Sequence, residues 1–140
     1  MDTEQLVALL VEDVWNGQGN QAGSLIDPSC PGLDGTGPDA VVAWHLDRRT
    51  AFPDLRYEVV SVVVSASNAA VRWRAQGHHK GTFGPVPATG RPVSYEGASF
   101  LTFRQGRLVD VWSVNDLFGL VHQLGAQVVS PNLDLLADDG

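Results

Sequence analysis

The chain has 140 residues, of which 44% are hydrophobic and 18% are charged, and its formal net charge at pH 7 is -7. This length suits one domain with a real core, so we expect residues 1–140 to form a single domain. The acidic balance offers no basic stripe for a nucleic-acid partner, and it disfavours acidic substrates unless a local arginine holds them. The single cysteine, Cys30, excludes an intrachain disulfide.

The N-terminal segment carries Glu12 and Asp13 where a signal peptide would have its apolar core. No segment approaches the length of a membrane span. We therefore expect no membrane partner and a cytoplasmic location.

Two helices are expected before the middle of the chain. Asp2 and Gln5 have the spacing of a capping box, and apolar residues then recur at helical spacing through 3–16. Residues 27–38 hold three prolines and three glycines, which predicts a long loop. A second helix is expected from Pro38 to about Thr50, with His45 partly exposed on it.

The second half of the chain is rich in β-branched residues. Extended segments are expected over 56–65, 69–83, 91–103 and 107–115. Gly97 interrupts the third segment and predicts a bulge or a bend there. Helices followed by antiparallel strands predict an α+β fold, a curved antiparallel sheet wrapped over the N-terminal helices. Residues 126–140 are expected to form a loosely held acidic tail.

The last strand leads into a short helix through Asp116. Period-two alternation puts Trp112, Val114 and Asp116 on one side of this strand, and we expect that side to face the interior. Asp116 is then either the N-cap of the helix that begins at Leu117 or a pocket carboxylate. The residues alone favour the N-cap interpretation.

The adjacent histidines His78 and His79 point to opposite faces of a strand and cannot bind one metal ion together, so no metal site is expected. The odd-numbered residues of 69–79 are the apolar set and should face the interior, with His79 at the polar end. His79 is either an acid/base or hydrogen-bond donor in a pocket, or a satisfied histidine at its rim.

A set of short motifs runs through the chain in a fixed order. They read AFPDL at 51–55, VRW at 71–73, GHHKGTF at 77–83, TGRPV at 89–93, GRLVDVW at 106–112 followed by Asp116, and QLG at 123–125. In order and spacing they resemble the SnoaL-like polyketide cyclases, of the cone-shaped α+β barrel superfamily that includes ketosteroid isomerase, scytalone dehydratase and nuclear transport factor two. Two positions depart from that pattern, because 27–31 lacks a histidine found in many relatives and His78 replaces a threonine.

The resemblance implies a cofactor-independent polyketide cyclase that closes a ring by an intramolecular aldol reaction in a hydrophobic pocket. Asp116 would be the acid/base, so the resemblance favours a catalytic role for this residue over the N-cap interpretation. His79 would polarise the substrate or relay a proton. The expected substrate is an uncharged hydrophobic carbonyl compound of polyketide type. The expected pocket walls are Trp112, Trp73, Phe103, Trp44 and Val114.

Other functions on the same fold stay open. They are a related isomerase, hydrolase or hydroxylase-type enzyme, and a non-catalytic module that binds a small molecule. The sheet face with Arg72, Arg74 and Gln76 is half polar and should lie outside, and relatives pair through that face. We therefore expect a homo-oligomer, a dimer or a tetramer.

Overall fold

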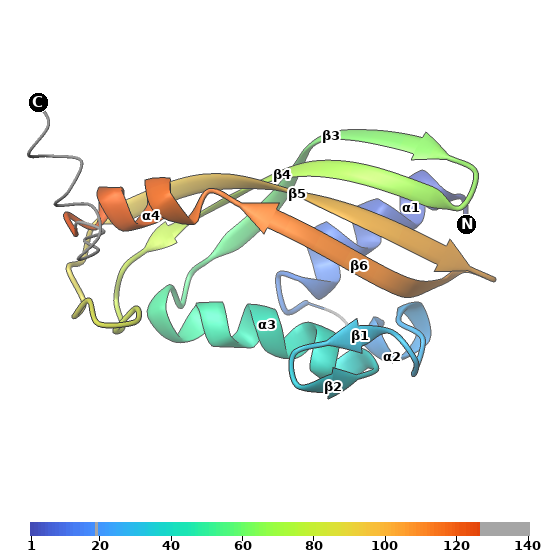
Figure 1. Cartoon of the computed structure of the whole chain (residues 1–140), viewed down its shortest axis with the longest axis horizontal. Helices are drawn as coiled ribbons and strands as arrows, with labels where there is room; N and C mark the ends of the chain where they lie inside the picture. Colours follow the sequence, from blue (N-terminus) through green and yellow to red (C-terminus); the bar gives the residue numbers. More distant parts are fainter. Residues whose placement is uncertain (19, 127–140) are drawn as a thin grey trace, which may run out of the picture.

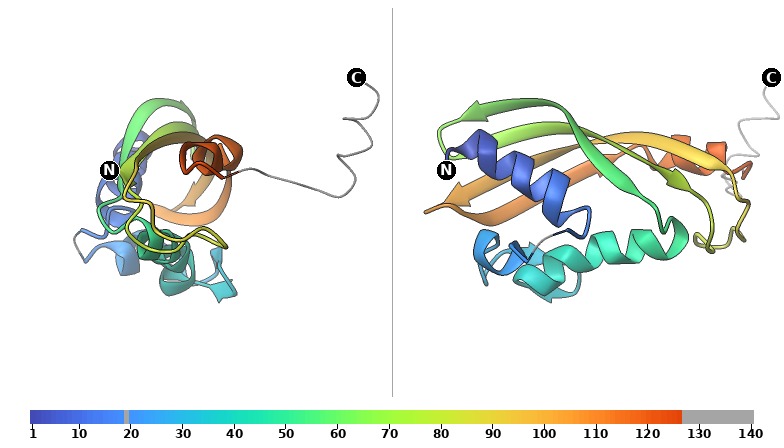
Figure 2. Two further views of the ribbon diagram at one scale, coloured as in Figure 1. Left: turned by 90° about the vertical axis from the view of Figure 1, so that its left-hand side faces the viewer. Right: turned by 180° about the vertical axis from the view of Figure 1, so that it is seen from behind.

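The computed structural model describes residues 1–18 and 20–126, and it has an α+β architecture in which a curved four-stranded sheet arches over helices (Figure 1). Seen end-on, the strands of the sheet curve strongly, and α3 lies below them (Figure 2). The predicted fold class is confirmed. The predicted tail beyond Ala126 lies outside the described residues, so its conformation stays a prediction.

The helices begin and end close to where the sequence predicts. The first helical stretch joins α1 (Thr3–Ala8) to a π-helical segment, η1 (Leu9–Val14), and Asp2 and Gln5 form the expected capping box. A short α2 (Ala22–Leu25) follows. Helix α3 (Pro38–Ala51) starts at its proline, and α4 (Leu117–Gln123) starts after Asp116.

The predicted long loop before α3 contains a two-stranded hairpin, β1 (Pro31–Gly32) and β2 (Gly35–Thr36). The hairpin packs on α3 because Gly32 has no side chain, and a Cβ there would meet the backbone of Ala40 at 2.3 Å. The loop is therefore a fixed wall beside the helix.

The sheet consists of β3 (Arg56–Ser65), β4 (Asn68–His78), β5 (Pro92–Arg104) and β6 (Arg107–Asn115), antiparallel and in sequence order. The predicted second strand runs too far, because after His78 the chain leaves the sheet. Lys80 and Gly81 instead donate backbone hydrogen bonds to the carbonyl of Ala51 at the end of α3. The inward face of β4 is as predicted: its odd-numbered residues through His79 are almost all buried.

The predicted inward face of β6 is wrong. Leu108 is fully buried, but a register shift beside it leaves Val109 without a partner on β5. Such a bulge reverses the alternation of side chains beyond it. Past the bulge, Trp112 and Val114 are therefore exposed on the outer face of the sheet, at 57% and 48%.

Gly97 lies in an unbroken part of β5, so of the predicted bulge or bend the bulge is wrong. The glycine is required by the packing of Trp73 on β4, because a Cβ at position 97 would lie 2.3 Å from the indole ring. The ring lies across the backbone of Gly97 and beside Tyr95, 6.0 Å between ring centroids. The indole of Trp73 thus packs on the inner face of the sheet.

None of the described helices has the length and hydrophobicity needed to cross a membrane.

Candidate functional site

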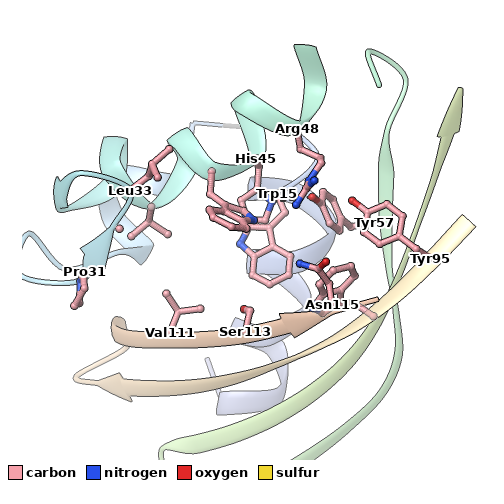
Figure 3. A pocket seen from close by; sticks show the side chains of 14 residues that line it. Trp15, Pro31, Leu33, His45, Arg48, Tyr57, Tyr95, Val111, Ser113 and Asn115 are labelled. Carbon is pink, nitrogen blue, oxygen red and sulfur yellow. Dashed lines mark hydrogen bonds between the residues drawn. The ribbon is translucent and has the colours of Figure 1, made fainter. Parts of the chain in front are cut away.

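An aromatic cavity of about 320 Å³ lies between the inner face of the sheet and α3 (Figure 3). Its walls come from η1 and its C-terminal end, the β1 hairpin, α3 and all four strands of the main sheet. It is lined by Trp15, Pro31, Gly32, Leu33, Val41, Trp44, His45, Arg48, Tyr57, Trp73, Tyr95, Val111, Ser113 and Asn115. The size and the mainly apolar walls with a few polar groups are typical of small-molecule sites.

His45, Tyr57 and Tyr95 contribute polar groups to the wall of this cavity. The Nδ1 atom of His45 is hydrogen-bonded to the hydroxyl of Tyr57 at 3.0 Å. His45 is buried and stacks on Trp15, 4.5 Å between ring centroids. The stacking fixes the imidazole, so the His45–Tyr57 pair is in place before any ligand binds.

The side chains of His45, Tyr57 and Tyr95 are uncharged at neutral pH. Burial, followed by the charges of Arg49 and Arg48, lowers the pKa of His45 to about 3. Burial also raises the pKa of Tyr57 and of Tyr95 above the ordinary value of a phenol. A neutral imidazole and two neutral phenols can donate hydrogen bonds to a ligand oxygen, but they are weak bases.

No Asp or Glu among the described residues lines the cavity. The same part of the chain contains no cluster of three His, Cys, Asp or Glu residues that could hold a metal ion. The polar groups of the walls are therefore the imidazole of His45, the phenols of Tyr57 and Tyr95, and the side chains of Arg48, Ser113 and Asn115. They suit the binding and polarisation of an oxygen more than the removal of a proton.

The neutral state of His45 predicts a pH-dependent stability. Its pKa is about 3 in the folded protein and about 6.5 in the unfolded chain, so below pH 6.5 the unfolded chain binds a proton that the fold does not. Stability should fall as pH decreases from about 6.5 towards 3, by at most about 1.4 kcal/mol per pH unit for this one group. Urea unfolding of wild type and of His45→Gln at pH 4–7 measures the effect.

The expected result is a steeper loss of stability on acidification in wild type than in His45→Gln. The exposed carboxylates whose pKa is lowered, such as Asp54, titrate in both proteins and cancel in the difference. Parallel pH profiles would contradict a buried neutral His45.

Asp116 does not line the cavity. It is exposed beyond the end of β6, and its carboxylate accepts a hydrogen bond from the N–H of Gly119 at 2.9 Å, as the N-cap of α4. Its inward orientation was predicted from the alternation that the bulge at Val109 reverses. The residue that faces inward next to it is Asn115. The catalytic role of Asp116 stays a prediction.

His79 is fully buried but does not line the cavity either. Its Nδ1 accepts a hydrogen bond from the N–H of Thr89 at 3.1 Å, and its ring packs on Phe52 at 5.5 Å between centroids. In this position it ties down the loop over residues 80–90. Asp116 and His79, both within the described part of the chain, are not hydrogen-bonded to each other. The polarising role of His79 also stays a prediction.

Of the predicted pocket walls, Trp44 and Trp73 line the cavity. Phe103 is buried in the core under the other end of the sheet, and Trp112 and Val114 are on the outer face. The inward residues of β6 are instead Val111, Ser113 and Asn115. Ser113 is bonded to the buried Ser99 at 2.6 Å, which accepts the indole N–H of Trp73.

The sequence analysis missed the His45–Tyr57 hydrogen bond, because it interpreted His45 as a partly exposed helix residue. His45 is 6% exposed. One signal was available, since Val41, Trp44, His45 and Arg48 have the three- and four-residue spacing of one helix face. That face lies against the cavity.

Comparison with known proteins identifies relatives. Residues 5–124 match the family model of the SnoaL-like polyketide cyclases. No curated protein matches the chain. Among solved structures, IdmH of Streptomyces antibioticus, a candidate polyketide cyclase, is 26% identical with a TM-score of 0.78, over 90% of this chain and 100% of its own.

Two further structures widen the range of described activities. A SnoaL-like polyketide cyclase of Agrobacterium tumefaciens is 26% identical, with a TM-score of 0.75 over 89% of this chain and 99% of its own. AclR of Streptomyces galilaeus, a candidate hydroxylase, is 27% identical, with a TM-score of 0.72 over 98% of this chain and 91% of its own. The shared architecture is therefore associated with more than one reaction.

Proposed function

Because the chain belongs to the SnoaL-like polyketide cyclase family, we propose that it closes a ring in a polyketide-type carbonyl compound by an intramolecular aldol reaction. The observation that carries the proposal is the aromatic cavity with the hydrogen-bonded His45–Tyr57 pair and Tyr95 on its wall. The reaction needs no oxidant and no group donor, since a C–H bond and the π bond of the attacked carbonyl break while a C–C bond and an O–H bond form within one molecule.

The electrophilic half of the reaction suits the cavity. When an enol or enolate carbon attacks a carbonyl carbon, negative charge develops on the carbonyl oxygen. The neutral hydroxyls of Tyr95 and Tyr57 would donate hydrogen bonds to that oxygen, and His45 would hold the hydroxyl of Tyr57 in place. Burial strengthens such hydrogen bonds, because few water molecules compete with them.

The proton-removing half depends on a group outside the walls or on the acidity of the substrate. Methylene groups between two carbonyls lose a proton readily. Asp116, the acid/base implied by the resemblance, follows the pocket residue Asn115 directly in the chain, and we propose it as the acceptor, which requires its carboxylate to turn from Gly119 toward the cavity. The aromatic walls would hold the flexible substrate folded, so that the two reacting carbons meet.

A direct assay tests the proposal. A linear aromatic carboxylic acid with a 1,3-diketone side chain is incubated with the protein, and the cyclised isomer is quantified by chromatography and mass spectrometry. We expect ring closure well above the rate in buffer. Binding of the compound without any acceleration would contradict the proposal.

A second candidate function is a non-catalytic small-molecule binding module. The observation that favours it is the lack of a carboxylate on the cavity walls of the described chain. The same assay separates the two functions, because a binding module binds the compound and leaves its cyclisation rate unchanged.

We also propose that two copies pair through the outer face of the sheet. On that face the ion pairs Arg72–Glu96 (2.8 Å) and Arg74–Glu58 (3.1 Å) bridge neighbouring strands. Next to them, Phe100 is 53% exposed and packs on the exposed Trp112, 5.6 Å between ring centroids. Large aromatic side chains exposed together are typical of a protein–protein interface.

The pairing predicts a dimer that one charge disrupts. Wild type is expected to have about twice the mass of one chain in light scattering at micromolar concentration. Trp112→Glu should give the monomer, because it buries a charge at the interface. Lys80→Glu, away from that face, is the control and should stay dimeric. A monomeric wild type would overturn this proposal.

A further inference from the structure

The cavity carries one cationic side chain on its wall, Arg48 of α3. Its guanidinium carbon lies 5.7 Å from the ring centre of Trp44 and 5.2 Å from that of Phe83. Figure 3 shows the side chain extending from the helix toward the hydroxyl ends of Tyr57 and Tyr95. Two aromatic contacts of this kind hold a guanidinium in place and leave N–H groups at its edge available for an acceptor.

Within residues 1–18 and 20–126, no carboxylate forms a salt bridge with Arg48. The neighbouring Arg49 is used differently, since its guanidinium donates to the backbone carbonyl of Trp15. Burial and the charges of Arg49 and Arg48 together lower the pKa of His45, and the charge of Arg48 opposes the burial that raises the pKa of Tyr57 and Tyr95. The polar part of the cavity is therefore electropositive although the whole protein is acidic.

We propose that the ligand of this cavity carries a carboxylate, which pairs with the guanidinium of Arg48 while its aromatic or polyketide body lies between the tryptophans. This deepens the proposed function and rests on it, because it names a feature of the compound that the same cavity binds. It also replaces the sequence-based expectation of an uncharged ligand. A single planar cation matches a single planar carboxylate, through two parallel N–H···O bonds.

The ion pair between Arg48 and the ligand carboxylate also determines which carbonyl of the ligand is attacked. With the carboxylate fixed at Arg48, the neighbouring hydroxyl of Tyr95 donates to a ligand oxygen close to that end. The attacked carbonyl would therefore lie near the carboxyl end of the chain, and a substrate without that carboxylate would lose its orientation as well as affinity.

A matched pair of probes tests the proposal without any turnover. Binding of 2-naphthoate and of its methyl ester is measured by isothermal titration calorimetry with wild type, Arg48→Gln, Arg48→Lys and Arg104→Gln. Wild type should bind the acid at least tenfold more tightly than the ester, the range of a charge-assisted hydrogen bond. Arg48→Gln should lose about tenfold in affinity for the acid and less than twofold for the ester.

The other variants separate a specific ion pair from a general effect of charge. Arg104→Gln removes the same charge from the exposed end of β5 and should bind both probes like wild type. Arg48→Lys should recover part of the affinity for the acid.

Equal binding of acid and ester by wild type, or an equal loss in Arg104→Gln, would overturn the carboxylate proposal and leave the proposed function standing. Failure of both probes to bind would count against the cavity as the ligand site, and with it against both proposals.

Discussion

Tyr95→Phe is expected to slow ring closure by about two to three orders of magnitude, the usual effect of removing one hydrogen-bond donor from an oxyanion site. The phenylalanine keeps the ring that lies beside Trp73 and removes only the hydroxyl. The KM should change much less than kcat, because the lost hydrogen bond is strongest when charge develops on the oxygen. Steady-state kinetics with the diketone acid measures both constants.

Asp116→Asn is the matched comparison. Asparagine caps a helix about as well as aspartate, so the variant should fold like wild type. If Asp116 removes the proton, as the resemblance implies, turnover in this variant should fall by roughly two to four orders of magnitude. Full turnover in Asp116→Asn with a large loss in Tyr95→Phe would assign the chemistry to the cavity wall alone. Full turnover in Tyr95→Phe would contradict the proposed hydrogen-bond donor.

Gly97→Ala should destabilise the protein by about 3 kcal/mol, at the upper end of the effect of overpacking. The new Cβ would lie 2.3 Å from the ring of Trp73 and 2.6 Å from the carbonyl oxygen of Val114. The indole cannot move away freely, because its N–H is bonded to Ser99 and its ring contacts Tyr57 and Tyr95. The free energy of unfolding in urea measures the loss, and ligand affinity should fall with it.

Gly23→Ala is the control for this substitution. A Cβ at position 23 would have no atom within 4 Å and would lie in the short helix α2. Its stability should match wild type within about 1 kcal/mol, the helix-propensity difference between glycine and alanine. Equal stability of Gly97→Ala and wild type would mean that Trp73 does not lie across position 97.

The sequence determined the elements whose signals are local. The capping box at Asp2, the proline start of α3 and the capping of α4 by Asp116 depend on residues within one helical turn. The inward face of β4 follows from an unbroken alternation of side chains, and so it was predicted correctly. Together these signals were enough for the α+β fold, which the structure confirms.

Only the tertiary structure decided which residues form the cavity. The inward face of β6 depends on the bulge at Val109, where one residue has no partner on β5. No residue type in that segment predicts the bulge. Because the period of a strand is two, one unpaired residue moves Trp112 and Asp116 outward and Ser113 and Asn115 inward. Likewise, His45 is buried and neutral because Trp15 and Tyr57, distant in the chain, pack around it. The alternation of a strand and the face of a helix are local properties, but the side that meets a partner is set by strand register and by contacts between distant segments.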